Sequence, residues 1–254
     1  MHILFTVCGR AGSKGVKSKN IRDFLGKPLV MHTIAAIALF TNKNPQYCCS
    51  VAVNTDSIEM VKILQNQSIY EKEVLFVPRL PELAGDTIAK GAVIMNTLEN
   101  VEAQVNVKYD MVVDLDITSP LRTVRDIENL IAKKLESDFD TVFSVVESRR
   151  NPYFNMVQER NGTYKPIIET AFTARQQTPI VYDMNASMYA YSPEFLKSGK
   201  RMFDGRCGII KMQDTGVLDI DHEQDFELME VLAKWFIEND KEFAEVLAMK
   251  NKRL

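Results

Sequence analysis

The 254-residue sequence lacks the features that mark several large classes of protein. Its formal net charge of −3 excludes the strongly basic composition of a general nucleic-acid binder. Its longest apolar stretch, PLVMHTIAAIALF (28–40), is too short to cross a bilayer and has helical spacing. The opening residues MHILFTVCG carry no basic leader and predict a strand. We therefore expect a cytoplasmic protein that binds neither nucleic acid nor a membrane.

Cysteine and histidine are also scarce. The four cysteines lie in strand-like apolar stretches without CxxC spacing, which excludes the usual zinc and redox motifs. The three histidines, at positions 2, 32 and 222, form no cluster. The sequence thus predicts a reduced protein with no cysteine- or histidine-based motif.

Apolar strand patterns alternate with helical patterns in the first 145 residues. Strands are expected at 2–8, 48–55, 74–78, 109–117 and 140–146, and helices at 28–40, 57–67, 86–100 and 124–136. This alternation predicts a single α/β domain over 1–254: three layers, with a mostly parallel, twisted sheet and helices on both faces. Residues 147–184 are polar and irregular and are expected to leave the sheet as an arm. Strands at 187–192 and 207–212 and an amphipathic helix then close the domain.

The turn after the first expected strand combines glycines with basic residues. In GRAGSKGVKSKN (9–20) the glycines let the backbone turn, and Arg10, Lys14 and Lys19 supply charge for an anion such as a polyphosphate. The spacing fits neither GxxxxGK[ST] nor GxGxxG, which argues against a P-loop NTPase and a dinucleotide dehydrogenase. Taken alone, a solvated basic loop stays equally open.

Acidic residues near the C-terminus form a second candidate site. Asp219 and Asp221 are two positions apart, so at a strand end both face one side, and paired carboxylates suit Mg²⁺ or another divalent cation such as Mn²⁺. The alternative is that Asp221 caps the last helix and Asp225 complements its dipole. For Asp225 we expect this structural role.

These stretches resemble the acylneuraminate cytidylyltransferase family. Every fixed position of the family's R-x-G-S-K-G-x-x-x-K-N loop, which wraps the triphosphate of CTP, is present. Four further stretches match in the family's order: PRLPELAGDT, LDITSPLRT, ARQQTPIVYDMNASMYAY and DIDHEQDF. The matches run from residue 5 to about 226. The resemblance implies a Rossmann-like nucleotidyltransferase fold.

The resemblance also implies the roles of individual residues. Those expected to bind the nucleotide are Arg10, Gly12, Ser13, Lys14, Lys19, Asn20, Arg79, Ala84 and Asp86. Those expected to bind the sugar are Asp116, Thr118, Ser119, Arg175, Gln176 and Tyr182. The metal would be held by Asp219 and Asp221, which with Arg10, Lys14 and Lys19 would carry the catalysis. For Arg175 the alternative is a surface arginine paired with an acid such as Glu169, and Arg122 is expected to be structural, buried against its turn.

The implied reaction is nucleotidyl transfer from CTP to the anomeric hydroxyl of a sialic-type 2-keto sugar acid, with release of pyrophosphate. The partners implied are CTP, the acidic sugar, Mg²⁺ and a second copy of the chain, joined through a dimerisation arm at 147–184 that lends residues to the partner's site. Two alternatives stay open. One is an eight-carbon Kdo-type acid or another nucleotide, and the other is a non-catalytic nucleotide- or sugar-binding homologue.

Two departures from the family pattern bear on the sugar. Asp116-Ile117 stands where Gln-Pro is usual, and a carboxylate accepts hydrogen bonds but does not donate them. Asp116 therefore suggests a substrate amine or hydroxyl facing it, or a second carboxylate near the metal. Asn185-Ala186-Ser187 replaces the commoner Asn-Gly-Ala, which we expect to narrow the sugar pocket.

Overall fold

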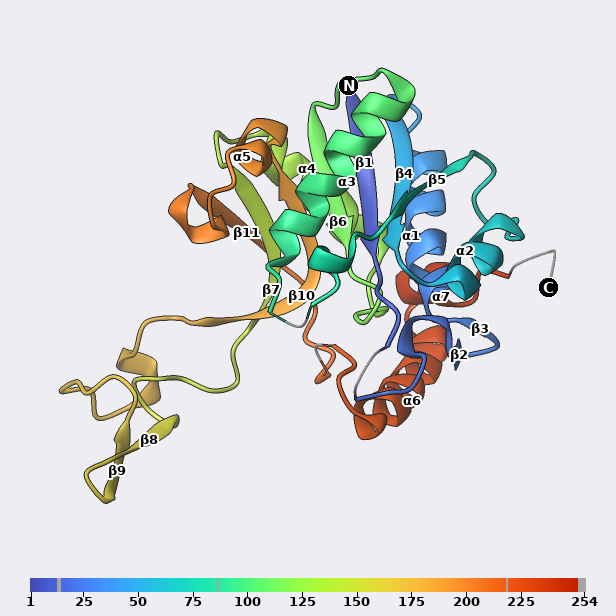
Figure 1. The fold of residues 1–254 in the computed structure, drawn as a ribbon. Helices are drawn as coiled ribbons and strands as arrows, with labels where there is room; N and C mark the ends of the chain where they lie inside the picture. The colour runs from blue at the N-terminus through green and yellow to red at the C-terminus, as the bar shows by residue number, and fades with distance from the viewer. Residues whose placement is uncertain (13–14, 86, 218, 251–254) are drawn as a thin grey trace.

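A seven-stranded sheet forms the centre of the computed structural model, which describes residues 1–12, 15–85, 87–217 and 219–250 (Figure 1). The strand order is β11-β7-β10-β6-β1-β4-β5, and β10 alone in this sheet runs antiparallel to its neighbours. The strands are β1 (His2–Cys8), β4 (Cys48–Thr55), β5 (Val74–Pro78), β6 (Met111–Leu115), β7 (Thr141–Glu147), β10 (Tyr182–Tyr191) and β11 (Cys207–Lys211).

Helices cover both faces of this sheet because strand side chains alternate between two cores. On β1, Phe5 belongs to a core with α1, α2, α4, α6 and α7, whereas its neighbour Leu4 belongs to a core with α3 and α5. The helices are α1 (Val30–Lys43), α2 (Ile58–Gln65), α3 (Lys90–Val105), α4 (Val124–Leu135), α5 (Pro193–Lys197), α6 (Glu223–Asn239) and α7 (Lys241–Leu247). The expected three-layer, mostly parallel α/β fold is confirmed. In the described ranges, no helix combines the length and apolarity needed to cross a membrane.

Several element boundaries differ from the expectation. The strand expected from Ser187 begins at Tyr182, because residues 182–184 already pair with β7. Helix α3 begins at Lys90, after the extended Ala89. Asp219 and Asp221 do not lie in a strand, so that expectation is wrong. A last helix was also missed: the Asp240 carboxylate accepts hydrogen bonds from the first backbone amides of α7, which starts a new helix where α6 ends.

Residues 148–181, between β7 and β10, project from the sheet as the arm (Figure 1). The arm holds a small hairpin of β8 (Val157–Arg160) and β9 (Thr163–Pro166) and the short helix η3 (Arg175–Gln177). Asn161 and Gly162 turn this hairpin with positive φ of 53° and 77°, the conformation that a tight hairpin turn requires. Asn151 ties the base of the arm, since its side-chain amide donates to the Thr178 hydroxyl at 3.0 Å.

The carboxyl ends of β1, β4, β5 and β6 meet at one edge of the sheet. Loops that leave these strands are distant in sequence but become neighbours in space. This edge is where ligands bind in open α/β sheets.

Candidate active site

A cavity of about 380 Å³ opens at this edge. Its lining draws on the basic loop, the loops after β5 and β6, the start of α3 and the segment before α6. The lining residues are Cys8, Gly9, Arg10, Gly15, Lys19, Asn20, Arg79, Leu83, Gly85, Ile88, Lys90, Val93, Asp116, Thr118 and Asp221. The structure thus brings together seven of the residues singled out from the sequence: Arg10, Lys19, Asn20, Arg79, Asp116, Thr118 and Asp221. We call this space the first cavity.

The basic loop is fixed to the ends of β1 and β4. The Ala11 amide donates to the Asp56 carboxylate at 2.6 Å, and the buried Asn20 amide donates to the Arg10 carbonyl at 3.1 Å. Arg10 reaches the PRLPELAGDT stretch, because it donates to the Ala84 carbonyl at 3.1 Å. Gly12 turns the loop with a φ of 73°. Of the other predicted nucleotide residues, Ser13, Lys14 and Asp86 lie outside the described residues.

Contacts join the basic loop directly to the segment before α6. A Cβ atom on Gly15 would lie 1.8 Å from the Asp221 carbonyl oxygen, so only glycine fits this approach. The Lys19 ammonium donates to the Ile220 carbonyl and lies 3.5 Å from the Asp221 carboxylate. The predicted phosphate ligand Lys19 and the predicted metal ligand Asp221 are therefore neighbours.

Negative charge gathers where the metal was predicted. Burial raises the pKa of Asp219 to about 6, and the nearby carboxylates of Asp221 and Asp116 add to the effect. Across the described ranges, no group of three or more His, Cys, Asp or Glu side chains is placed to hold a metal. Asp219 and Asp221 could thus supply two oxygens and leave the remaining positions to phosphate and water, as Mg²⁺ prefers.

Asp225 has the structural role expected of it. Its carboxylate accepts hydrogen bonds from the Asp221 and His222 amides at 3.0 and 2.7 Å at the start of α6. His222, and not Asp221, occupies the capping position of this helix. The Asp221 carboxylate is therefore not used as a helix cap.

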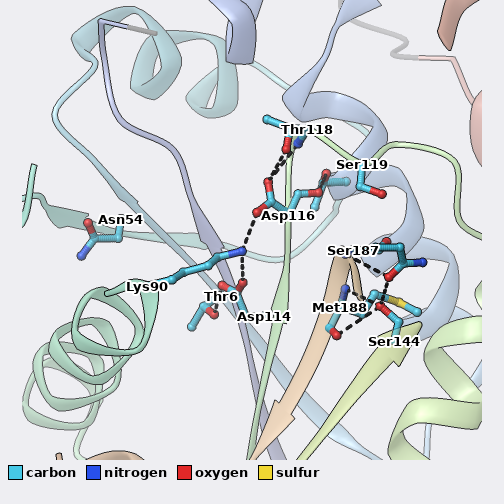
Figure 2. Close-up of polar contacts among 12 residues, drawn as sticks. Thr6, Asn54, Lys90, Asp114, Asp116, Thr118, Ser119, Ser144, Ser187 and Met188 are labelled. Atoms are coloured by element: carbon cyan, nitrogen blue, oxygen red, sulfur yellow. Dashed lines mark hydrogen bonds and ion pairs between the residues drawn. The ribbon is translucent and has the colours of Figure 1, made fainter. Parts of the chain in front are cut away.

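Asp116 is paired inside the protein, which the sequence did not predict (Figure 2). Its carboxylate lies 2.6 Å from the Lys90 ammonium and accepts the Thr118 amide and hydroxyl, both at 3.0 Å. Burial raises the pKa of this carboxyl, but the Lys90 charge and the Thr118 donors outweigh burial and hold the pKa at about 2. Lys90 also lies 2.7 Å from Asp114, which is fully buried and accepts from the Thr6 hydroxyl.

Lys90 and Asp114 are therefore site residues that sequence reasoning missed. The sequence contained a signal for Asp114, because it interrupts an otherwise apolar strand and a buried carboxylate needs a partner. It contained none for Lys90, because the helix was expected from residue 86 and only the structure makes Lys90 the first residue of α3.

The turn after β6 is built around buried polar groups. Arg122 is fully buried and donates to the carbonyl oxygens of Ser119 and Asp116, which confirms its expected structural role. Ser119, predicted to bind sugar, is only 4% exposed. After the end of β5, Arg79 donates to the Asn54 side chain at 2.9 Å, which holds its guanidinium at the cavity wall.

The remaining predicted sugar residues lie away from the first cavity in this chain. Arg175 and Gln176 line a separate cavity of about 400 Å³ at the base of the arm, and Arg175 donates to the Ser148 carbonyl at 3.4 Å. Arg175 is exposed, and Glu169, the acid suggested as its alternative partner, pairs with Arg160 and Lys165. Tyr182 lies on β10, where the Lys211 ammonium is 5.7 Å from its ring centroid.

A second cavity, of about 450 Å³, adjoins the first at Lys90, which lines both. Its lining comes from the start of α3, β10, α5 and the segment after α5, and is largely apolar or aromatic. The lining residues are Ala89, Lys90, Gly91, Ala92, Met95, Met184, Tyr189, Tyr191, Phe195, Leu196, Gly199, Lys200, Arg201 and Met202. The irregularity in β10 between Met184 and Tyr189 contains Ala186, whose φ is 52°. The departure at Ala186 therefore places a side chain on a left-handed residue, where glycine is favoured.

Comparisons with known proteins agree with this architecture. The family model described as cytidylyltransferase matches residues 4–250. The post-translational flagellin modification protein B of Campylobacter coli is 35% identical over 91% of this chain and 95% of its own length. The CMP-N,N'-diacetyllegionaminic acid synthase of Campylobacter jejuni is 34% identical over 91% of this chain and 94% of its own length. A CMP:2-keto-3-deoxy-manno-octonic acid synthetase, solved with CTP, shares the fold, with a TM-score of 0.65 at 15% identity over 92% of this chain and 99% of that one. The resemblance inferred from the loop and its companion stretches is confirmed, and this chain belongs to the cytidylyltransferase family.

Proposed function

We propose that this chain transfers CMP from CTP to the anomeric hydroxyl of a nonulosonic, sialic-type 2-keto sugar acid. The observation that carries the proposal is the first cavity, where the basic loop, Arg79 and the Asp221 segment converge. Its cationic groups suit a triphosphate, and a carboxylate beside them suits its metal. The legionaminic acid synthase named above supports the choice of sugar class.

The two cavities fit the two substrates of this reaction. CTP would occupy the first cavity, with Arg10, Lys14 and Lys19 on the phosphates. The sugar acid would occupy the second cavity, whose apolar wall suits acylamino groups and whose rim carries Lys200 and Arg201. The anomeric oxygen then attacks the α-phosphorus, the bond to the β-phosphate breaks, and pyrophosphate leaves with the bonding electrons. The hydroxyl proton passes to solvent.

Asp219 and Asp221 would hold a divalent cation, Mg²⁺ or Mn²⁺, against the phosphates. Such a cation would neutralise charge on the triphosphate and on its leaving group. Within the protein, the basic loop holds the phosphates and Gly15 keeps the loop against Asp221. Positioning and charge neutralisation are the main demands of nucleotidyl transfer, so a cysteine or serine nucleophile is not required.

The chain would act as one cytoplasmic catalytic domain that dimerises through its arm. Support comes from the apolar side chains that the arm exposes, including Val157, Tyr164 and Ile180 at 59%, 71% and 69%. In such a dimer, Arg175 and Gln176 would reach the sugar in the partner's site, with the Arg175 guanidinium on its carboxylate. Sedimentation equilibrium tests this: the chain should be a dimer, and Tyr164→Glu should shift it toward monomer.

Pyrophosphate release tests the function. Purified protein would be incubated with CTP and Mg²⁺ against sialic, legionaminic, pseudaminic and Kdo-type acids. We expect release with a nonulosonic acid, reduced at least about 100-fold by Asp221→Asn, the scale of losing a positioned charge interaction, and unchanged by Glu227→Gln on the exposed face of α6. Release with the Kdo-type acid alone would replace the sugar class, and CTP binding without release from any acid would support a non-catalytic homologue.

A further inference from the structure

Lys90 is the side chain shared by the two cavities. It begins α3 and lines both the first and the second cavity. Figure 2 shows its ammonium reaching between Asp114 and Asp116, with which it makes contacts of 2.7 and 2.6 Å. The point where the two substrates must meet is therefore occupied by a lysine.

The two carboxylates hold the Lys90 ammonium in place but do not use all of its hydrogen-bond donors. A lysine ammonium carries three N–H donors, and its hydrogen bond to Asp116 and ion pair with Asp114 leave at least one of them for a ligand. Asp114 is immobile, because it is fully buried in the central strand β6 and also accepts from Thr6. The Lys90 side chain is nevertheless 33% exposed, so a ligand in either cavity can reach it.

Lys90 lowers the negative charge at the junction of the two cavities. One ammonium stands between two carboxylates, so without it the junction would carry two uncompensated negative charges. Such a site would repel a sugar carboxylate placed there. With Lys90 in place the junction as a whole carries a net charge of −1, and the Lys90–Asp116 pair by itself offers a donor and an acceptor with no net charge. A side-chain amide offers the same combination, which gives a physical reason why a carboxylate can stand where the family usually has glutamine.

We propose that Lys90 determines specificity for the acidic sugar by donating its remaining N–H to the sugar carboxylate at the junction of the two cavities. Asp114 and Asp116 act as positioning residues that orient the ammonium. The inference rests on the proposed function, since it assigns one contact within that same reaction.

Calorimetry separates binding from turnover in the test. The four acids of the panel are titrated into protein loaded with α,β-methylene-CTP, and the Michaelis constants for acid and CTP are measured separately. Lys90→Gln should weaken binding of the acid at least about 10-fold, the value of one charge-assisted hydrogen bond, and change CTP affinity far less. Lys90→Arg should retain most of the affinity. Lys62→Gln, on α2, removes a charge that lines neither cavity and should change nothing.

A double variant distinguishes the contact from charge balance. Lys90→Gln with Asp116→Asn restores the formal charge of the junction but not the ammonium donor, so the acid should still bind weakly. Recovery of wild-type affinity for the acid in the double variant would overturn the proposal. The proposal would also fail if the wild type turns the acid over and the Lys90→Gln variant binds that acid with normal affinity. Binding that depends on Lys90 without any turnover would support the contact and refute the proposed function. A wild type that binds no acid would refute both.

Discussion

His32 gives the protein a predictable sensitivity to acid. The side chain is 1% exposed on α1, and its Nε2 atom lies 2.8 Å from the Phe24 carbonyl oxygen. Burial, assisted by the nearby Lys27 charge, lowers the pKa of His32 to about 3. The folded protein therefore keeps this imidazole neutral at every pH where the protein is ordinarily handled.

The sign and size of the effect follow from linkage. The ordinary histidine pKa is 6.5, so between pH 6.5 and 3 the unfolded chain binds a proton that the folded chain does not. The free energy of unfolding therefore falls as the pH drops through this window. At pH 5 the gap to the unfolded pKa is about 1.5 units, which corresponds to about 2 kcal/mol. Above pH 6.5 neither the folded nor the unfolded chain binds this proton, so the group costs no stability there.

Urea unfolding of His32→Gln at pH 7.5 and pH 5.0 tests the reasoning. Glutamine can donate to the same Phe24 carbonyl but does not titrate. We expect the wild type to lose about 2 kcal/mol more than the variant between these two pH values, whereas His2→Gln, an exposed control, should follow the wild type. Equal losses in wild type and His32→Gln would refute the assignment of a neutral, buried imidazole.

Three further predictions concern the loop, the bulge in β10 and an ion cluster. Gly15→Ala should lower kcat/KM for CTP at least about 10-fold with little change in Tm, because the new Cβ would displace Asp221; an active enzyme would show that this contact opens freely. Ala186→Gly should stabilise the protein by about 0.5 to 1 kcal/mol, because the strain of a left-handed alanine exceeds the entropy that glycine adds to the unfolded chain. If this strain is absent, urea unfolding would show a lower stability in the variant. Glu102→Gln should destabilise the protein by about 1 to 2 kcal/mol. This carboxylate is 7% exposed and 2.7 Å from Lys197, and a midpoint unchanged in urea would contradict the prediction.

Sequence patterns predicted the sheet and most of its helices because these depend on local periodicity. The buried runs of β1, β4 and β6 and the turn chemistry after β1 are contained in short windows. The boundary of β10 was missed because Tyr182 belongs to the strand only through pairing with Glu147, a contact 35 positions away along the chain. The end of α6 and start of α7 depend on one cap, Asp240, inside an otherwise continuous helical pattern.

The parts of the candidate site that lie in contiguous motifs were predictable from the sequence. The parts that depend on an ion pair between side chains of different helices and strands were not. The basic loop and the Asp221 segment were assigned from two separate motifs, and the structure places both at the first cavity. Asp116, by contrast, was interpreted as a charge facing the substrate or the metal. Its partner Lys90 comes from a helix 26 positions earlier, and only the fold brings them within 2.6 Å. The roles of these residues in binding stay predictions.

The way the arm leaves the sheet has a consequence for how such proteins diversify. β7 and β10 are adjacent antiparallel strands, and Glu147 lies opposite Tyr182 at the point where the arm begins and ends. In topological terms the arm is the loop of one long hairpin, so a short turn could close the same pair of strands without altering any other connection. Insertions, deletions or wholesale exchange within 148–181 therefore leave the order of the sheet intact. A lineage could change its mode of assembly through this segment without replacing the residues that line the first and second cavities, which lie outside 148–181.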